Sequence, residues 1–184
     1  MFCGIDIGIR KCVAAVINDE VLYLGDYGEI PVKFKAAGID APLSFPERGA
    51  FRECERLLLK MGIRLFPSGA QFFRRIALRG MEIAEELKKR GVEVFEVYPY
   101  ATRVLLNIAP GEKKHKKEGL KKIEDELSKF VKVEGLTHDE IDAIIAALTV
   151  KLYYEGKAVI LKGSDGSILV PKANLQHTLI DWQE

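Results

Sequence analysis

Two short stretches of the sequence place an aspartate inside an apolar run, where a carboxylate needs a specific reason to be. Asp6 stands in "GIDIG" and Asp40 in "GIDAPLSFP", and both runs have the β-branched, apolar character of buried strands. An unpaired carboxylate in such surroundings costs several kcal/mol unless it has a partner, a cation or a raised pKa. Asp6 and Asp40 are therefore candidates for a site with a chemical role.

Three further acids have positions that fit the same site. Glu96 lies near the end of the alternating run "VEVFEV", and Asp139 and Asp142 are three residues apart, on one face of an expected helix. The small residues Ala143 and Ala146 next to that face would let the helix approach a sheet closely. Three or four neighbouring carboxylates repel one another, and Mg²⁺ or Mn²⁺, which prefer carboxylate oxygens, would relieve that repulsion.

A pair of such ions can hold the attacking and leaving oxygens of a phosphodiester displacement. The acids therefore indicate a metal-dependent phosphodiesterase. Each acid also has a simpler interpretation as a turn former, a helix cap or a surface residue. That alternative is strongest for Asp139, because a negative charge near a helix N-terminus is favourable in itself.

The hydrophobic pattern predicts the elements that would position these acids. Three strands in an antiparallel meander come first, and later strands alternate with amphipathic helices. This order predicts an α/β fold with a mixed sheet covered by helices on both faces, in a single domain over residues 1–184. The expected strands are Phe2–Ile9, Lys11–Ile17, Val21–Leu24, Ala36–Ala41, Val92–Val97, Lys157–Leu161 and Ser167–Val170, and the expected helices are Phe51–Met61, Gln71–Arg90, Lys116–Val131 and Thr137–Tyr154.

The composition is ordinary for a globular protein and narrows the function only slightly. The 184 residues are 48% hydrophobic and 30% charged, with a net charge of +1, which argues against a strongly basic coat protein. Three cysteines without a CxxC pair are typical of a reduced, cytoplasmic chain. Asp6 and Arg10 interrupt the first apolar run, so we expect no secretory signal, and no run is long enough for a membrane span.

Four stretches together resemble a known family: "GIDIG", "IDAPLSFP", "RGMEIAEELKKRGVEVFEVYP" and "HDEIDAIIAALTVKLY". They resemble the domain-of-unknown-function 429 family, predicted nucleases of the RNase H-like superfamily, from Gly4 to Pro171. The resemblance implies an RNase H-like sheet of five strands, an antiparallel three-strand meander plus parallel strands.

The resemblance also implies roles for individual acids. Asp6 would match the acid of the first strand, Asp40 that of the fourth and Asp142 that of the last core helix, where His138 and Asp142 also resemble Holliday-junction resolvases. Glu96, in the family's "EVYP", would be a fourth acidic member. Whether Asp139 or Asp142 is the main helix ligand stays open, and we favour Asp142.

A basic run, "GEKKHKKEGLKK", covers residues 111–122 and opens an expected helix. Its lysines could contact the phosphate backbone of a nucleic acid beside the acidic site, or simply form a solvated face. The candidates for nucleic-acid contact are Lys113, Lys114, Lys116 and Lys117.

The expected function is a nuclease that uses Mg²⁺ or Mn²⁺ in a two-metal mechanism, with Asp6, Asp40, Glu96 and Asp142 as catalytic and metal-binding residues. One alternative is a non-catalytic nucleic-acid-binding module that retains the fold. The other is a phosphotransferase of the actin-like ATPase class, for which "GIDIG" would contact phosphate. That class needs two such domains around a nucleotide cleft. The kind of nucleic acid, the polarity of cutting and the oligomeric state do not follow from the sequence.

Overall fold

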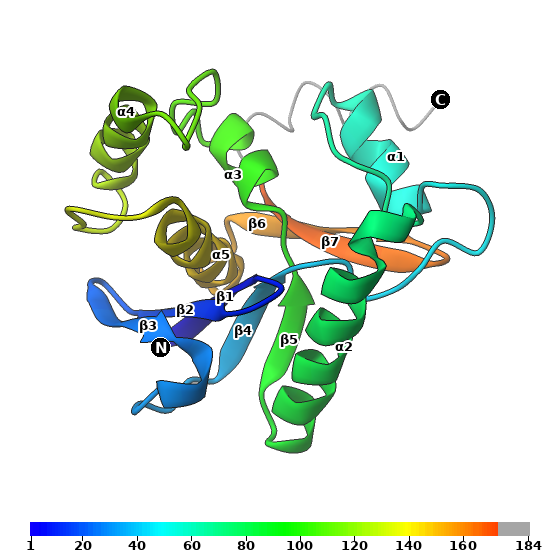
Figure 1. The fold of residues 1–184 in the computed structure, drawn as a ribbon, viewed down its shortest axis with the longest axis horizontal. Helices are drawn as coiled ribbons and strands as arrows, with labels where there is room; N and C mark the ends of the chain where they lie inside the picture. The colour runs from blue at the N-terminus through cyan, green and yellow to red at the C-terminus, as the bar shows by residue number, and fades with distance from the viewer. Residues whose placement is uncertain (173–184) are drawn as a thin grey trace.

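A computed structural model describes residues 1–172 of the chain, and its centre is a mixed sheet of five strands in the order β3-β2-β1-β4-β5 (Figure 1). The first three strands pair antiparallel, whereas β4 runs parallel to β1 and β5 runs parallel to β4. This is the RNase H-like arrangement expected from the sequence. The strands are β1 (Phe2–Ile7), β2 (Cys12–Ile17), β3 (Val21–Asp26), β4 (Ala36–Asp40) and β5 (Glu93–Glu96).

Helices cover both faces of this sheet, as predicted (Figure 1). Cys3, Ile5 and Ile7 of β1 pack in one core with α2, whereas Phe2 packs in the other core with α5. Because side chains alternate along a strand, Gly4 and Asp6 share the α5 face with Phe2. The helices are α1 (Glu53–Lys60), α2 (Arg74–Lys89), α3 (Pro99–Leu105), α4 (Lys117–Leu127) and α5 (His138–Tyr154).

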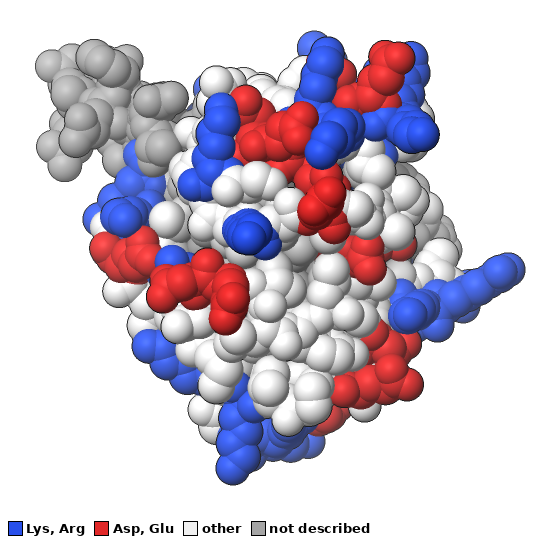
Figure 2. Space-filling view, turned by 90° about the vertical axis from the view of Figure 1, so that its left-hand side faces the viewer, with Lys and Arg blue, Asp and Glu red and all other residues white. Residues whose placement is uncertain are grey.

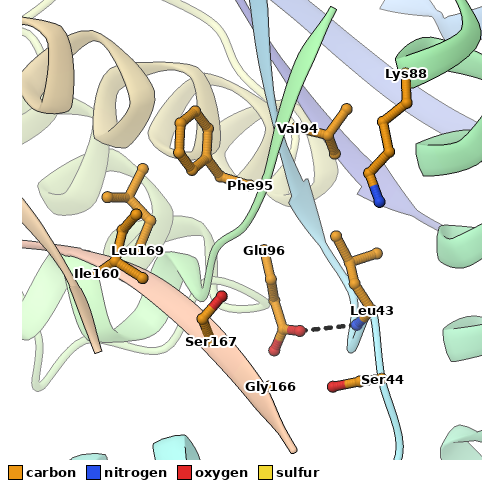
Figure 3. A pocket seen from close by; sticks show the side chains of 10 residues that line it. All are labelled: Leu43, Ser44, Lys88, Val94, Phe95, Glu96, Ile160, Gly166, Ser167 and Leu169. Carbon is orange, nitrogen blue, oxygen red and sulfur yellow. Dashed lines mark hydrogen bonds between the residues drawn. The ribbon is translucent and has the colours of Figure 1, made fainter. Parts of the chain in front are cut away.

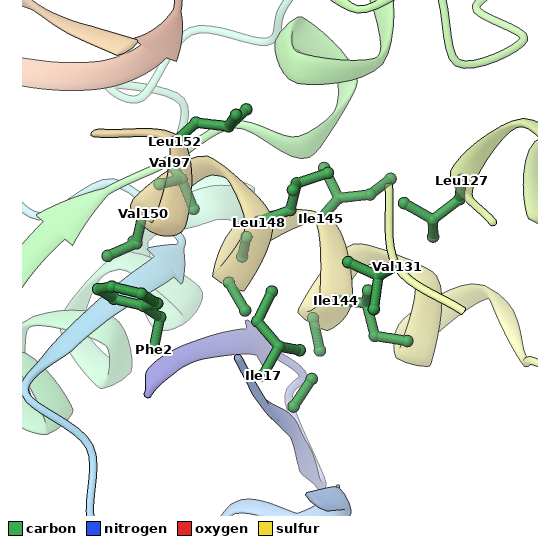
Figure 4. Close-up of a cluster of buried hydrophobic side chains, with 14 of the residues drawn as sticks. Phe2, Ile17, Val97, Leu127, Val131, Ile144, Ile145, Leu148, Val150 and Leu152 are labelled. Atoms are coloured by element: carbon green, nitrogen blue, oxygen red, sulfur yellow. The ribbon is translucent and has the colours of Figure 1, made fainter. Parts of the chain in front are cut away.

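Helix α5 is the central element of the larger core (Figure 4). Thr137 caps its first turn, with Thr137 Oγ1 accepting a hydrogen bond from Glu140 N and the Glu140 carboxylate accepting one from Thr137 N. Every residue from Ile141 to Val150 is buried. The sequence predicted a single apolar stripe on this helix, but the helix is buried on all sides because α3, α4 and a hairpin cover the face turned away from the sheet.

That hairpin is a second, two-stranded sheet formed by β6 (Ala158–Gly163) and β7 (Gly166–Pro171). It packs against α1 and α3 in a third hydrophobic cluster, and Val97 forms a parallel bridge with Leu169. The two closing strands expected from the sequence are therefore present. They form a separate sheet beside the main one, and in the described part of the chain the main sheet has five strands.

The largest departure from the predicted elements is α3, which the sequence interpretation did not include. Pro99 begins this helix, and proline is favoured at the first position of a helix. A short 3-10 turn, Tyr27–Glu29, was also not predicted, and the start of the expected Gln71–Arg90 helix is a 3-10 turn, Gln71–Phe73.

Within the described part of the chain, no helix combines the length and apolar character needed to cross a membrane. The single domain expected over residues 1–184 stays a prediction, and residues 173–184 lie outside the described part.

Candidate metal centre

Asp6 and Asp40 lie side by side on neighbouring strands. Strands β1 and β4 are parallel and in register, so that Asp6 is the direct partner of Asp40. Asp40 is the last residue of β4, and Asp6 is the last but one of β1. The two carboxylates therefore meet at the carboxyl ends of parallel strands, on the face that α5 covers.

The glycine two residues before each aspartate explains how α5 comes close enough to join them. A Cβ atom added to Gly4 would lie 1.9 Å from Ala143 O and 2.3 Å from Ala147 N, and one added to Gly38 would lie 2.8 Å from Ala146 O. No side chain fits between β1 and α5 at Gly4. The repeated "GID" thus combines a glycine that admits the helix with an aspartate on the same face of the strand.

This close approach completes a group of three carboxylates. One oxygen from each of Asp6, Asp40 and Asp142 lies within 4.8 Å of the other two. Asp142 is buried, and the other two are partly buried. The convergence expected for these three acids is therefore present in the structure.

The electrostatics of the group show a negative charge that the fold only partly compensates. The pKa of Asp6 is raised to about 6, chiefly by burial and next by the nearby charge of Asp139, while Lys114 and His138 oppose the shift. Burial also raises the pKa of Asp40 well above its usual range, with the charge of Asp6 as the next cause. Both carboxylates would be stabilised in their charged form by a cation.

Asp139 lies at the edge of this group. Its carboxylate is half exposed, and Asp139 Oδ1 forms a hydrogen bond with His138 Nδ1 at 2.6 Å. It is also near enough to Asp6 to affect that pKa through charge and hydrogen bonding. Asp142 is the helix acid that joins Asp6 and Asp40 in the three-carboxylate group, while Asp139 borders the group from the first turn of α5.

The ammonium group of Lys114 is the positive charge that contacts this group of acids. Its Nζ donates a hydrogen bond to Asp142 Oδ2 in a close ion pair. The lysine side chain is 39% exposed, whereas that of Asp142 is 8% exposed, so the ammonium reaches the buried acid from the solvent side. From the sequence, Lys114 was a candidate for contact with nucleic acid, and its pairing with Asp142 appears only in the tertiary structure.

Glu96 does not join the three carboxylates. Its Oε2 accepts hydrogen bonds from Leu43 N and Arg52 Nη1, both at 2.7 Å, and its Oε1 pairs with Arg52 Nη2. Figure 3 shows this carboxylate turned toward the segment after β4, at a cavity of about 200 Å³ that Ser44 and Ser167 also line. Glu96 was expected to be a fourth metal ligand, but in this structure its carboxylate is bound by Arg52 and Leu43 N instead.

Glu96 instead belongs to a buried network around Arg52, whose side chain is 1% exposed. Arg52 also binds Glu55 Oε1 at 3.1 Å and Ser44 Oγ at 2.9 Å. These contacts tie the start of α1 and the loop after Asp40 to the end of β5. A buried arginine needs a charged partner, and the two terminal nitrogens of Arg52 pair with Glu96, Glu55 and Ser44, while its Nε has no hydrogen-bond partner among the described residues. The carboxylate of Glu96 is therefore already engaged.

The three-carboxylate group suits a divalent cation in its donor chemistry. Carboxylate oxygens are the ligands that Mg²⁺ and Mn²⁺ prefer, and Asp6, Asp40 and Asp142 supply them from three rigid elements. The raised pKa values of Asp6 and Asp40 are what uncompensated, partly desolvated carboxylates show before a cation neutralises them.

Lys114→Met should increase the affinity for Mn²⁺ by about a factor of ten, because the ammonium no longer competes for Asp142. The methionine keeps the length of the side chain and removes its charge. The measurement is isothermal titration of Mn²⁺ into the wild type and the variant. Lys121→Met is the control, since the exposed Lys121 pairs with Glu124 and Asp125 on α4 and with none of the three acids. An unchanged or weaker Mn²⁺ affinity in Lys114→Met would show that Lys114 does not occupy a cation position.

Comparison with known proteins gives a family match for the sequence and a weaker similarity to solved structures. The sequence model of the family described as "Protein of unknown function (DUF429)" matches residues 4–165. No curated protein matches the chain. Two solved structures from Thermus thermophilus are similar to it, and each alignment covers 90% of this chain and 98% of the other chain. They are described as T. thermophilus RuvC in complex with Holliday junction substrate, at 14% identity and a TM-score of 0.46, and as Thermus thermophilus RuvC structure, at 13% and 0.45.

The match to the family model extends from Gly4 of the first "GID" to Asp165 in the turn of the β6–β7 hairpin, and so includes all three acids of the group. The chain belongs to the DUF429 family.

Proposed function

We propose that this protein is a nuclease that hydrolyses phosphodiester bonds with the help of Mg²⁺ or Mn²⁺. The observation that supports this proposal best is the convergence of Asp6, Asp40 and Asp142, with carboxylate oxygens within 4.8 Å of one another. Divalent ions held there would supply an activated water and stabilise the leaving oxygen, which is the chemistry of a two-metal site.

The residues in and around the site would have different roles. Asp6 and Asp40 hold the site from the sheet, and Asp142 closes it from α5. Glu96 acts by position, because it holds Arg52 and Leu43 N behind the loop that follows Asp40. A cation bound at the three acids would displace the ammonium of Lys114 from Asp142, and that ammonium would then be free to contact a phosphate of the substrate.

Three further lysines are placed to contact the nucleic-acid backbone. Lys113, Lys116 and Lys117 are exposed and form no ion pair within the part of the chain that the structure describes. Around α4, however, acidic and basic side chains lie next to one another (Figure 2). The surface around α4 is thus not uniformly basic. Phosphate contacts in this region would therefore come from the loop before α4 and from the start of that helix.

The proposal predicts cleavage of a nucleic acid that requires Mg²⁺ or Mn²⁺ and the buried helix acid. Labelled single-stranded, duplex and branched DNA, and the RNA counterparts, are incubated with the protein and each metal. Asp142→Asn should lower the rate by more than about a hundredfold, because it removes a ligand charge from the site. Asp125→Asn, an exposed change on α4, is the control and should keep full activity. Absence of metal-dependent cleavage on every substrate would refute the nuclease proposal.

The same experiments separate the alternatives. A non-catalytic binding module would bind nucleic acid without metal-dependent cleavage, and a phosphotransferase would release phosphate from ATP. We place the protein in the cytoplasm, which suits its three buried, unpaired cysteines, Cys3, Cys12 and Cys54.

A further inference from the structure

An aromatic cluster stands on the surface between α1 and α2. Phe66 is 69% exposed and Phe72 is 64% exposed, and both rings contact that of Phe73. The ring centroids of Phe72 and Phe73 are 4.8 Å apart, and those of Phe66 and Phe72 are 5.8 Å apart. Large apolar side chains that stay exposed as a group mark an interaction surface.

This cluster lies beside the three-carboxylate group. Phe66, Phe73 and Asp40 line one cavity of about 90 Å³. The topology explains the neighbourhood, because α2 leads from the carboxyl end of β4 back to the start of β5 (Figure 1). The first turn of α2 therefore lies at the same edge of the sheet as Asp40.

Three arginines that are close to these rings in the chain have no carboxylate partner among the described residues. Arg64, Arg74 and Arg75 are exposed, and none of them forms an ion pair with another described residue. Arg74 lies over the ring of Phe45, at 5.3 Å from the centroid. Two of these arginines are in the first turn of α2, which has no acidic residue. Positive charge is unfavourable at a helix N-terminus, so the fold gains nothing from them there.

We propose that Phe66, Phe72 and Phe73 stack on unpaired bases of a single-stranded nucleic acid, while the arginines contact its phosphates. The inference rests on the proposed function, because it places the scissile phosphate at the acids beside the rings. Aromatic rings next to cationic groups bind single strands through base stacking and backbone charge. In a duplex the bases stay stacked on one another, so the rings have no free base face to contact.

A second copy of this chain is a poorer occupant of the same surface. In a symmetric dimer the patch would face itself and bring Arg64, Arg74 and Arg75 against their own equivalents. Like charges at an interface disfavour association. A polyanion with flat apolar faces matches both the rings and the arginines.

The test measures binding without cleavage, in EDTA, by fluorescence anisotropy. The probes are a labelled oligothymidylate strand and a blunt duplex of the same length. Phe66→Ala and Phe72→Ala should each weaken binding of the single strand by about tenfold and leave duplex binding unchanged. Phe72→Leu, which stays apolar but cannot stack as a ring, should weaken it similarly. Phe130→Ala, an exposed ring after α4, is the control and should bind like the wild type.

Failure of this inference is distinguishable from failure of the nuclease proposal. Wild type that does not bind the single strand, Ala variants that bind it equally well, or full rescue by Phe72→Leu would overturn the stacking surface. A change from dimer to monomer in Phe72→Ala, seen by sedimentation, with unchanged strand binding would instead identify a protein interface. If the Phe variants lose single-strand binding but the wild type cleaves nothing with any metal, the surface stands and the nuclease does not.

Discussion

Asp6→Asn is expected to abolish metal-dependent cleavage while leaving the protein folded and, without metal, more stable than the wild type. Burial and the charge of Asp139 raise the pKa of Asp6 from 3.8 to about 6. Asn has nearly the same shape and no charge, so near neutral pH it should relieve about 3 kcal/mol of this cost. Cleavage should fall because an amide binds Mg²⁺ or Mn²⁺ poorly compared with a carboxylate.

The pH dependence follows from the direction of that shift. An acid with a raised pKa in the folded state holds its proton more tightly when folded than when unfolded. Its cost to stability is therefore absent below about pH 4, grows as the pH rises to about 6, and stays constant above that. Asp40, whose pKa is also raised, extends the same trend to higher pH. The metal-free wild type should thus lose stability relative to Asp6→Asn across this range.

Thermal unfolding of both proteins, in EDTA and in excess Mn²⁺, measures these effects. The wild type should gain stability from Mn²⁺, because the ion binds only the folded site, and Asp6→Asn should gain much less. The ranking of the two proteins should therefore reverse between the two conditions. A wild type that gains no stability from Mn²⁺ or Mg²⁺, or an Asp6→Asn protein that does not fold, would identify Asp6 as a structural residue.

Gly4→Ala should destabilise the protein by about 3 kcal/mol or more and should separate Asp142 from the two strand acids. The added methyl group would lie 1.9 Å from Ala143 O, in the backbone of α5, where no side-chain rotation can relieve the overlap. Either α5 moves away from β1 or β1 bends, and both movements open the group of three carboxylates. Gly38→Ala should act in the same direction but less strongly, because its closest contact would be 2.8 Å.

Urea unfolding and Mn²⁺ titration check this prediction together. Gly111→Ala is the matched control, because a Cβ at that position meets no atom within 4 Å and its backbone needs no positive φ. The control should be close to the wild type in both measurements. Equal stability of Gly4→Ala and the wild type would mean that α5 does not depend on the glycine for its position. Normal stability with weakened Mn²⁺ binding would assign the glycine to the site alone.

The local pattern was sufficient to predict the sheet and the three acids. The apolar, β-branched runs around Asp6 and Asp40 placed both acids on strands, and the expected helix Thr137–Tyr154 located α5. These features depend on neighbouring residues, so the sequence contains them directly. The small residues Ala143 and Ala146 indicated a helix that approaches the sheet closely, and the family resemblance favoured Asp142 over Asp139 as the helix acid.

Features that depend on contacts between distant segments were decided only by the tertiary structure. Glu96 lies on the predicted strand, but Arg52, 44 positions earlier in the chain, engages its carboxylate. Lys114 reaches Asp142 across 28 positions. Neither partner is visible in a local pattern, because ion pairs follow proximity in space.

The roles of Gly4 and of the exposed phenylalanines also depend on contacts between distant segments. A glycine in a strand indicates close packing only when the element opposite it is known, and here that element is α5. No local pattern marks Phe66 and Phe72 as exposed, but the fold leaves both rings exposed, and Phe66 lines a cavity together with Asp40. The sequence by itself therefore determined the elements and the acids they carry. The packing of α5 on the sheet decided which acids meet, because only that contact sets the distance between them.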